Sequence, residues 1–182
     1  VLVPSAFAYN DKVAHPWYAT LGFNRGTLAN AVKPYKKLRK ATRDDLIQAN
    51  VNPITSILGE GTVILGQETM QKRETALSKI NVRRLLIEAK KFISTVAWQT
   101  IGEPNNATTR GQLESIINNY LEGVRRDNGL ERFRVDFSDD VNTPDVVNRN
   151  LVRDVIELVP TKAVEGIQIN FVIRNSGVSF ND

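Results

Sequence analysis

The chain of 182 residues contains no cysteine, a single histidine and a single methionine. Without cysteine there can be no disulfide bond, no thiolate nucleophile and no cysteine-based zinc site. The one histidine, His15, precedes Pro16 and has no second imidazole with which to complete a triad or a metal site. A structural or incidental role is therefore favoured for His15 over a catalytic one.

Long apolar runs are also absent. No run approaches the length that crosses a bilayer, and the first residues, Val1-Leu2-Val3-Pro4, lack the charged and apolar regions of a signal peptide. We therefore expect a soluble chain that is not secreted and does not insert into a membrane. Because the chain begins with Val rather than Met, we also expect it to be a fragment of a larger protein.

Enzyme motifs are missing as well. Residues 61–68 contain the two glycines of a phosphate-binding loop, but Gln67 stands where lysine is needed and Glu68 where a magnesium-binding hydroxyl belongs. The acidic stretch 136–145 contains Pro144 and lacks the downstream glutamate of a calcium loop. The sequence thus favours a protein without enzymatic activity, metal or cofactor.

Positive charge is present but uneven in a chain of net charge +4. Residues 13–43 have no carboxylate, and the basic residues among them are Arg25, Lys33, Lys36, Lys37, Arg39, Lys40 and Arg43. A solvated basic face is the simplest interpretation of such a run. The alternative is a basic nucleic-acid-binding module in which Trp17, Tyr18 and Phe23 stack on bases, although aromatic side chains on an exposed segment more often contact protein.

The first half of the chain predicts short elements. Residues 1–26 predict a strand followed by an extended, turn-rich arm. The sequence Thr42-Arg43-Asp44-Asp45 has the form of a capping box and predicts a brief helix that ends before Asn52-Pro53. Residues 54–58 and 62–65 predict a hairpin whose turn is Gly59-Glu60-Gly61.

The second half predicts two long helices and three strands. Apolar residues recur at helical spacing over 80–100 and again after a capping box at Thr109 and Gln112, with Gly129 after the second helix. Residues 133–137 alternate between apolar and polar side chains, and residues 152–159 and 167–173 predict a further hairpin around Pro160.

Together these elements predict an α+β fold, with a small mixed β-sheet flanked by two long α-helices and with extended terminal arms. A hydrophobic fraction of 41% and the chain length are consistent with one domain over residues 1–182. In it, residues 1–26 form an N-terminal strand and arm, 27–150 a helical and hairpin body, and 151–182 a C-terminal hairpin and tail.

A series of short motifs runs along the chain. In order they are Trp17 with Asn24-Arg25-Gly26, Asn52-Pro53-Ile54, Gly66-Gln67-Glu68-Thr69, Ile80-Asn81-Val82-Arg83-Arg84-Leu85, Glu103-Pro104-Asn105 and the two strands around Pro160. In content and order they resemble the C-terminal domain of contractile bacteriophage tail sheath proteins, over almost the whole chain. The chain departs from that family at Ala19-Thr20-Leu21-Gly22, where the turn is usually richer in proline, and at Arg110, where the family often has an aromatic residue.

The resemblance implies a structural subunit that polymerises around a tail tube and contracts to drive the tube through the host envelope. Its implied partners are other sheath subunits, the tail tube protein, and the baseplate and tail terminator proteins, with no specific nucleic acid. The implied location is the virion tail, assembled in the host bacterial cytoplasm. The sheath of an R-type bacteriocin or a related contractile injection device remains open as an alternative.

The resemblance also implies two sets of functional residues. Terminal arms of the family add strands to the sheets of neighbouring subunits, which points to Val1, Leu2, Val3, Ile167, Ile169, Phe171 and Ile173. A largely electrostatic contact with the tube points to the basic residues Lys36, Lys37, Arg39 and Lys40. Arg83 and Arg84 are the alternative tube-facing pair, although the first turn of a helix disfavours cations.

Overall fold

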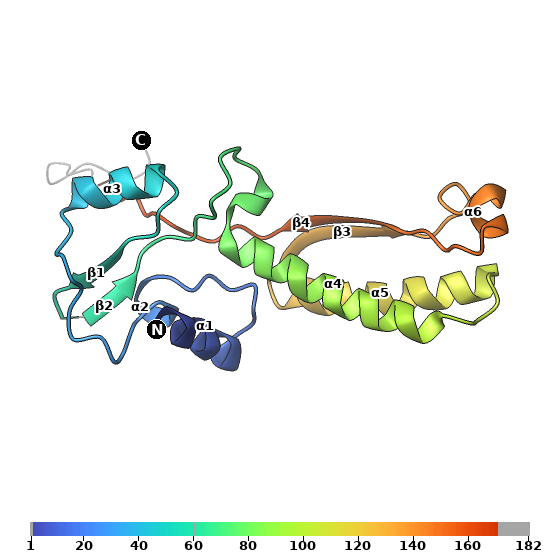
Figure 1. The fold of residues 1–182 in the computed structure, drawn as a ribbon, viewed down its shortest axis with the longest axis horizontal. Helices are drawn as coiled ribbons and strands as arrows, with labels where there is room; N and C mark the ends of the chain where they lie inside the picture. Colours follow the sequence, from blue (N-terminus) through green and yellow to red (C-terminus); the bar gives the residue numbers. More distant parts are fainter. Residues whose placement is uncertain (1, 60, 171–182) are drawn as a thin grey trace, which may run out of the picture.

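The fold is seen in a computed structural model, which describes residues 2–59 and 61–170. Its helices and strands form two lobes that lie end to end (Figure 1). We call residues 2–66 the N-terminal lobe and residues 80–160 the helical lobe. Residues 67–79, between the lobes, form the junction segment, and residues 161–170 are the described part of a C-terminal extension.

The N-terminal lobe combines short helices with a hairpin. Its elements are α1 (Leu2–Val13), α2 (Gly22–Arg25), α3 (Lys40–Gln48), β1 (Ile54–Ile57) and β2 (Gly61–Ile64). Strands β1 and β2 pair antiparallel, with Ile54 opposite Ile64. Gly59 and Gly61 adopt φ of 85° and 81°, which only glycine adopts readily, and the predicted hairpin is confirmed.

The predicted strand at the start of the chain is wrong. Leu2 and Val3 belong to helix α1, while Val1 lies outside the described residues. The apolar residues Leu2, Val3 and Ala6 have helical spacing, and they pack on a small core with Leu28 and Ile64. Pro4 does not oppose this helix because it lies in the first turn, where its missing N–H costs no hydrogen bond.

The helical lobe contains most of the hydrophobic core. Helices α4 (Ile80–Thr100) and α5 (Ala107–Arg126) pack against each other, and α5 packs on strand β3 (Leu130–Asp136). The buried core side chains are Leu85, Val96, Leu113, Ile117, Leu121, Val124, Leu130 and Phe137. Both long helices were predicted, and α4 has the predicted boundaries.

The predicted capping boxes are not the ones that the chain uses. Asn106 caps α5, because its side-chain oxygen accepts a hydrogen bond from the Thr109 N–H at 2.9 Å. Helix α3 begins at Lys40 without a side-chain cap, so Thr42 lies inside it. In the junction segment, Thr75 and Ser78 form a capping box around the short 3-10 helix η1 (Ala76–Ser78).

The strands form two separate sheets. Strand β4 (Val155–Pro160) pairs antiparallel with β3, with Val135 opposite Ile156, and α6 (Pro144–Asn148) lies in the connection. The α+β class with two long helices is confirmed, but in residues 2–59 and 61–170 there are two two-stranded antiparallel sheets instead of one mixed sheet.

The predicted pairing of residues 152–159 with 167–173 is also wrong. The partner of β4 is β3, and no strand follows Pro160 as far as Asn170. This pairing packs Phe133, Val135, Ile156 and Leu158 against the core. Ile167 and Ile169 are 82% and 68% exposed, so among the described residues they are not packed into a core.

Candidate assembly surfaces

Trp17 fastens the N-terminal lobe to the helical lobe. Its indole N–H donates to the carbonyl oxygen of Asp127 at 3.0 Å, and its ring packs against the main core. A Cβ added to Gly129 would lie 3.0 Å from the Trp17 ring and 2.6 Å from Val124. The first motif of the sequence is therefore a structural anchor, and a side chain at position 129 would displace it.

Asn52 holds the backbone of the junction segment. Its amide donates to the Glu68 carbonyl at 2.8 Å and its side-chain oxygen accepts from the Glu68 N–H at 2.7 Å. Gly66, at φ 135°, lies so close that an added Cβ would be 2.7 Å from the Asn52 side-chain oxygen. Two motifs that are distant in sequence thus form one contact.

Gln67 and Asn81 continue this network to the start of α4. The Gln67 side-chain oxygen accepts from the Asn81 N–H at 3.3 Å, and the Gln67 carbonyl accepts from the Ile80 N–H at 2.8 Å. The Asn81 side chain donates to the Trp17 carbonyl at 3.4 Å. Both amide side chains are almost fully buried. Gln67, in the segment that was compared with a phosphate-binding loop, thus makes its hydrogen bonds within the protein.

Arg83 and Arg84 are used within the chain. Arg83 donates to the Leu77 carbonyl at 2.8 Å and to the Gln71 side-chain oxygen at 2.6 Å. Arg84 donates to both carboxylate oxygens of Asp11 at 2.5 Å and joins α4 to α1. These contacts argue against Arg83 and Arg84 as the tube-facing pair.

The Glu103-Pro104-Asn105 motif closes the far end of the helical lobe. Asn105 donates to the Leu151 carbonyl at 2.9 Å and accepts from Arg110 at 3.2 Å. Arg110 also pairs with Asp139 at 2.8 Å. Arg110, where the family often has an aromatic residue, therefore ties this end of α5 to the loop after β3.

The basic residues predicted to face a tube lie together on an exposed segment. Lys36, Lys37, Arg39 and Lys40 are all exposed, at or just before the start of α3. Within residues 2–59 and 61–170, none of them forms an ion pair. Tyr35, in the same segment, is fully exposed.

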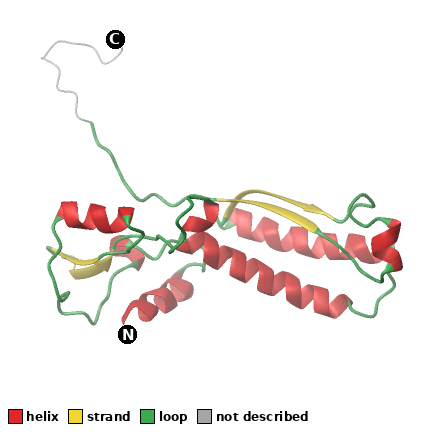
Figure 2. Ribbon diagram, turned by 45° about the horizontal axis from the view of Figure 1, so that its top comes forward, coloured by secondary structure: helices red, strands yellow, loops and turns green. Residues whose placement is uncertain are grey.

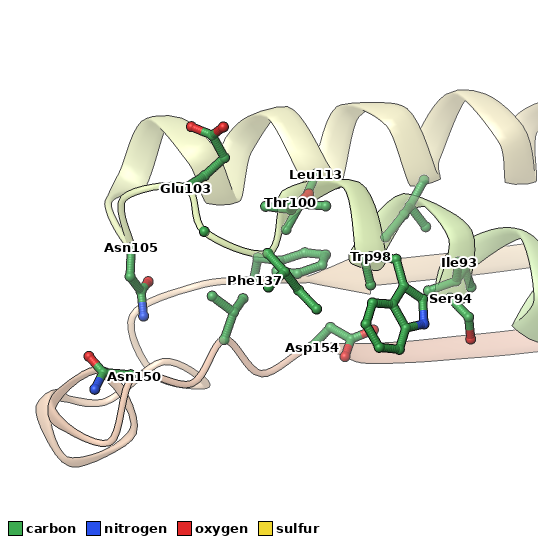
Figure 3. A pocket seen from close by; sticks show the side chains of 15 residues that line it. Ile93, Ser94, Trp98, Thr100, Glu103, Asn105, Leu113, Phe137, Asn150 and Asp154 are labelled. Carbon is green, nitrogen blue, oxygen red and sulfur yellow. The ribbon is translucent and has the colours of Figure 1, made fainter.

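Two hollows lie along helix α4. One of about 250 Å³ lies between the first half of α4 and β4, where Val82, Leu86 and Ile156 line it. Another of about 430 Å³ lies at the far end of α4, where Ile93, Trp98 and Phe137 line it (Figure 3). Trp98 is 74% exposed. The side of α4 toward β4 is thus apolar and incompletely covered.

The C-terminal extension is held at its base by one ion pair. Glu165 contacts the Lys79 amine at 2.7 Å, and Glu68 pairs with the same amine. Partial burial lowers the pKa of Lys79, but hydrogen bonds to Glu165 and Glu68 outweigh it and leave that pKa above its ordinary value. Farther along, the described extension runs away from the helical lobe (Figure 2).

Possible metal ligands do not cluster in the described part of the chain. In residues 2–59 and 61–170, no three histidine or acidic residues are placed to hold a metal ion together. His15 stacks on Trp17, with ring centroids 4.5 Å apart, and its imidazole lies 3.8 Å from the Asp127 carboxylate. Among these same residues, we find no helix with the length and apolarity needed to cross a membrane.

Comparison with known proteins connects this geometry to a protein class. The tail sheath protein of Vibrio phage KVP40 is 36% identical over 174 residues, which is 95% of this chain and 26% of that protein. The tail sheath protein of Enterobacteria phage T4 is 33% identical over 96% of this chain and 27% of that protein. The chain is homologous to phage tail sheath proteins. It spans about a quarter of the length of these relatives, and no family model matches it.

Solved structures share the fold of this sheath homologue. A chain in the six-fold symmetrised baseplate of the anti-feeding prophage has a TM-score of 0.86, at 20% identity, over 96% of this chain and 49% of that chain. A chain in the contracted sheath complex of the extracellular contractile injection system PVC has a TM-score of 0.84, at 19% identity, over 92% of this chain and 48% of that chain. The helical lobe and N-terminal lobe together therefore form a fold found in contractile assemblies.

Sequence reasoning missed the contacts that join the lobes. It singled out Trp17, Asn52, Gln67 and Asn81 as motif residues but gave them no structural role. Each of these residues is polar or amphipathic and lies in a motif without catalytic groups. That combination is the sequence feature that could have indicated a structural contact. The pairing of Lys79 with Glu165 had no signal, because 86 residues separate them.

Proposed function

We propose that this chain is part of a structural subunit of a contractile phage tail sheath, which polymerises around the tail tube and contracts to drive the tube through the host envelope. The observation that carries the proposal is 36% identity to a tail sheath protein over 95% of the chain. The role is mechanical and needs no enzymatic activity. The subunit works in the virion tail after assembly in the host cytoplasm.

Subunits are joined, in this proposal, by strands that one copy lends to another. Ile167 and Ile169 are exposed apolar residues at twofold spacing, which suits a strand with one apolar face. Phe171 and Ile173, outside the described residues, continue that spacing in the sequence. Leu2 and Val3 are no longer part of the proposal, because α1 packs them into the core of the N-terminal lobe.

Strand β4 is the acceptor that fits this donor. In the described residues β4 pairs only with β3, so its other edge keeps unpaired backbone donors and acceptors. A strand added at that edge would lie over the hollows beside α4. The lining residues of α4 run from Val82 to Thr100 and span about 27 Å at 1.5 Å per residue. A strand over residues 167–173 spans about 20 Å and would cover most of that length.

Contact with the tube is assigned to Lys36, Lys37, Arg39 and Lys40. Their support is exposure without an ion pair in the described residues, so their charge is available to an acidic partner. Such a contact is screened by salt and holds less firmly than a shared strand. Baseplate and tail terminator proteins would contact the end rings of the same polymer.

Electron microscopy of the full-length protein tests the proposal. We expect hollow tubular polymers, and we expect deletion of residues 161–182 to leave folded monomers without polymers. Reversing all four basic residues to glutamate should leave the free polymer intact and weaken its assembly on tubes. Uniform monomers of the full-length protein at high concentration would refute the proposal, and normal assembly on tubes after charge reversal would remove the four basic residues from it.

Two alternative functions have less support. The sheath of a bacteriocin-like or injection device is favoured only by fold, since the solved neighbours are 19–22% identical, whereas the phage relatives reach 36%. A nucleic-acid-binding module would show salt-dependent DNA binding by the isolated chain. We expect no such binding.

A further inference from the structure

The start of the C-terminal extension contacts the body of the protein through few polar groups. After β4 ends at Pro160, the Thr161 N–H donates to the Gly129 carbonyl at 3.2 Å. From there to Asn170, the pair between Glu165 and Lys79 is the one side-chain hydrogen bond or ion pair that joins the described extension to the rest of the described chain. Ala163 and Ile167 also line a hollow with Trp17 and Phe23, so this pair is the polar contact that directs the described extension.

Lys79 is itself held in place by the junction segment. Glu68 and Lys79 lie opposite each other in an isolated β-bridge, and the flanking Thr69 N–H donates to the Ser78 carbonyl at 2.8 Å. The Glu68 side chain is only 12% exposed and pairs with the Lys79 amine. The contacts of the junction segment thus position the Lys79 amine independently of the extension.

Acidic residues around Glu165 explain why its docking needs the Lys79 amine. The residues that line a hollow of about 530 Å³ beneath the extension include Glu74 and Glu131 in addition to Glu165. Without the Lys79 amine, the Glu165 carboxylate would approach like charges. Lys162 is the other cation that lines this hollow, and it forms no ion pair with any described residue.

We propose that Lys79, held by Glu68, is a positioning residue that docks Glu165 and thereby fixes the direction in which the C-terminal extension leaves its own subunit to pair with the next. The inference rests on the proposed strand exchange. A donor strand whose base is already fixed loses less conformational entropy on pairing than a free one. The clasp of Glu68, Lys79 and Glu165 thus prepares the extension for donation.

A distance measurement tests the clasp without assembly. The chain has no cysteine, so Lys90→Cys on α4 and Gln168→Cys on the extension provide two unique sites for spin labels. We expect a narrow distance distribution in the parent. Glu165→Gln should increase the population of undocked extension about twofold to fivefold, the range for a partly exposed ion pair. Lys162→Gln, the matched control, should match the parent.

Two further experiments separate the effect of the charges of the clasp from the effect of side-chain shape. Salt at about 1 M should broaden the parent distribution and change the Glu165→Gln variant little, because it screens the pair. The double variant Lys79→Glu with Glu165→Lys keeps two carboxylates around one amine and should restore the narrow distribution. An unchanged distribution in Glu165→Gln, or equal broadening in Lys162→Gln, would overturn the clasp.

Polymerisation of the full-length protein then tests positioning. Glu165→Gln should slow polymer growth about twofold to fivefold, and Lys162→Gln should not. Normal growth of Glu165→Gln despite a broadened distance distribution would overturn the positioning role. Failure of the parent itself to polymerise would refute the proposed sheath function, while the distance measurement would still decide whether the clasp exists.

Discussion

The two lobes are stabilised in different ways. The helical lobe has a continuous apolar core, whereas the core of the N-terminal lobe consists of Ala6, Leu28 and Ile64 with a few partly buried neighbours. The N-terminal lobe compensates with polar contacts to other parts of the chain, because Asn52 binds the Glu68 backbone and Trp17 contacts Asp127 and Asn81. The helical lobe is therefore expected to be the stable body on which the N-terminal lobe depends.

Loss of core volume in the helical lobe should have the largest effect. Leu121 is fully buried in α5, and Leu121→Ala should lower the free energy of unfolding by about 2–5 kcal/mol, because it removes apolar contacts and leaves a cavity. Urea denaturation followed by circular dichroism measures this. Ile116→Ala, at a 46% exposed site on the same helix, should cost about 0.5 kcal/mol or less. Similar losses for both variants would contradict the assignment of the core.

Crowding the Trp17 anchor should have the next largest effect. Gly129→Ala places a methyl group against Val124 and the Trp17 ring and should cost about 1–3 kcal/mol. Trp17 fluorescence, recorded in a Trp98→Phe background, should shift as the ring moves. Gly123→Ala in α5 meets nothing within 4 Å and should stabilise by about 0.5–1 kcal/mol as a helix-interior glycine. A stable Gly129→Ala variant with unchanged fluorescence would argue against the anchor.

Removal of the Asn52 amide should loosen the N-terminal lobe selectively. Asn52→Ala leaves the N–H and the carbonyl of Glu68 without their partners and should cost about 1–3 kcal/mol. Hydrogen exchange should accelerate in β1 and β2 and stay slow in α4 and α5. Asn119→Ala, at an exposed site on α5, is the control. Equal acceleration in both lobes would show that they do not differ in the way proposed.

The smallest effect is expected at Tyr120. Its hydroxyl is buried without a hydrogen-bond partner in the described chain, while its ring stacks on Phe92 at 3.9 Å. Tyr120→Phe should therefore be neutral or stabilising by up to about 1 kcal/mol. Burial, with Glu88 nearby, raises the pKa of Tyr120 in the folded state. The unfolded chain therefore loses this proton at a lower pH than the folded protein, and the free energy of unfolding falls as the pH rises above about 10. Thermal unfolding at neutral and alkaline pH should show that Tyr120→Phe lacks this component.

The same contrast explains which elements the sequence predicted. Helices α4 and α5 and strand β3 carry periodic apolar residues that face one core, so their local pattern and their tertiary contacts agree. At the start of the chain, the short apolar run Val1-Leu2-Val3 suited a strand as well as a helix in the sequence, and packing of Leu2 and Val3 on Leu28 and Ile64 favours the helix. The partner of β4 was ambiguous for a similar reason, because residues 133–137 and 167–173 both alternate.

The candidate surfaces were predicted less completely. The basic residues Lys36, Lys37, Arg39 and Lys40 lie together and exposed, as a run of charge without carboxylates suggests. Arg83 and Arg84 had the same charge in the sequence, and only their partners Gln71 and Asp11 distinguish them. The free edge of β4 and the hollows along α4 arise from three-dimensional packing, which local periodicity does not encode.

A structure of the assembled full-length polymer, determined by electron cryomicroscopy, would test strand donation most directly. We expect the residues that follow Glu165 in one copy to form a strand along the free edge of β4 in a neighbouring copy, with Ile167 and Ile169 turned toward α4 of that neighbour. An extension that pairs only within its own subunit, with the β4 edge of every copy left open or covered by another element, would contradict the proposal.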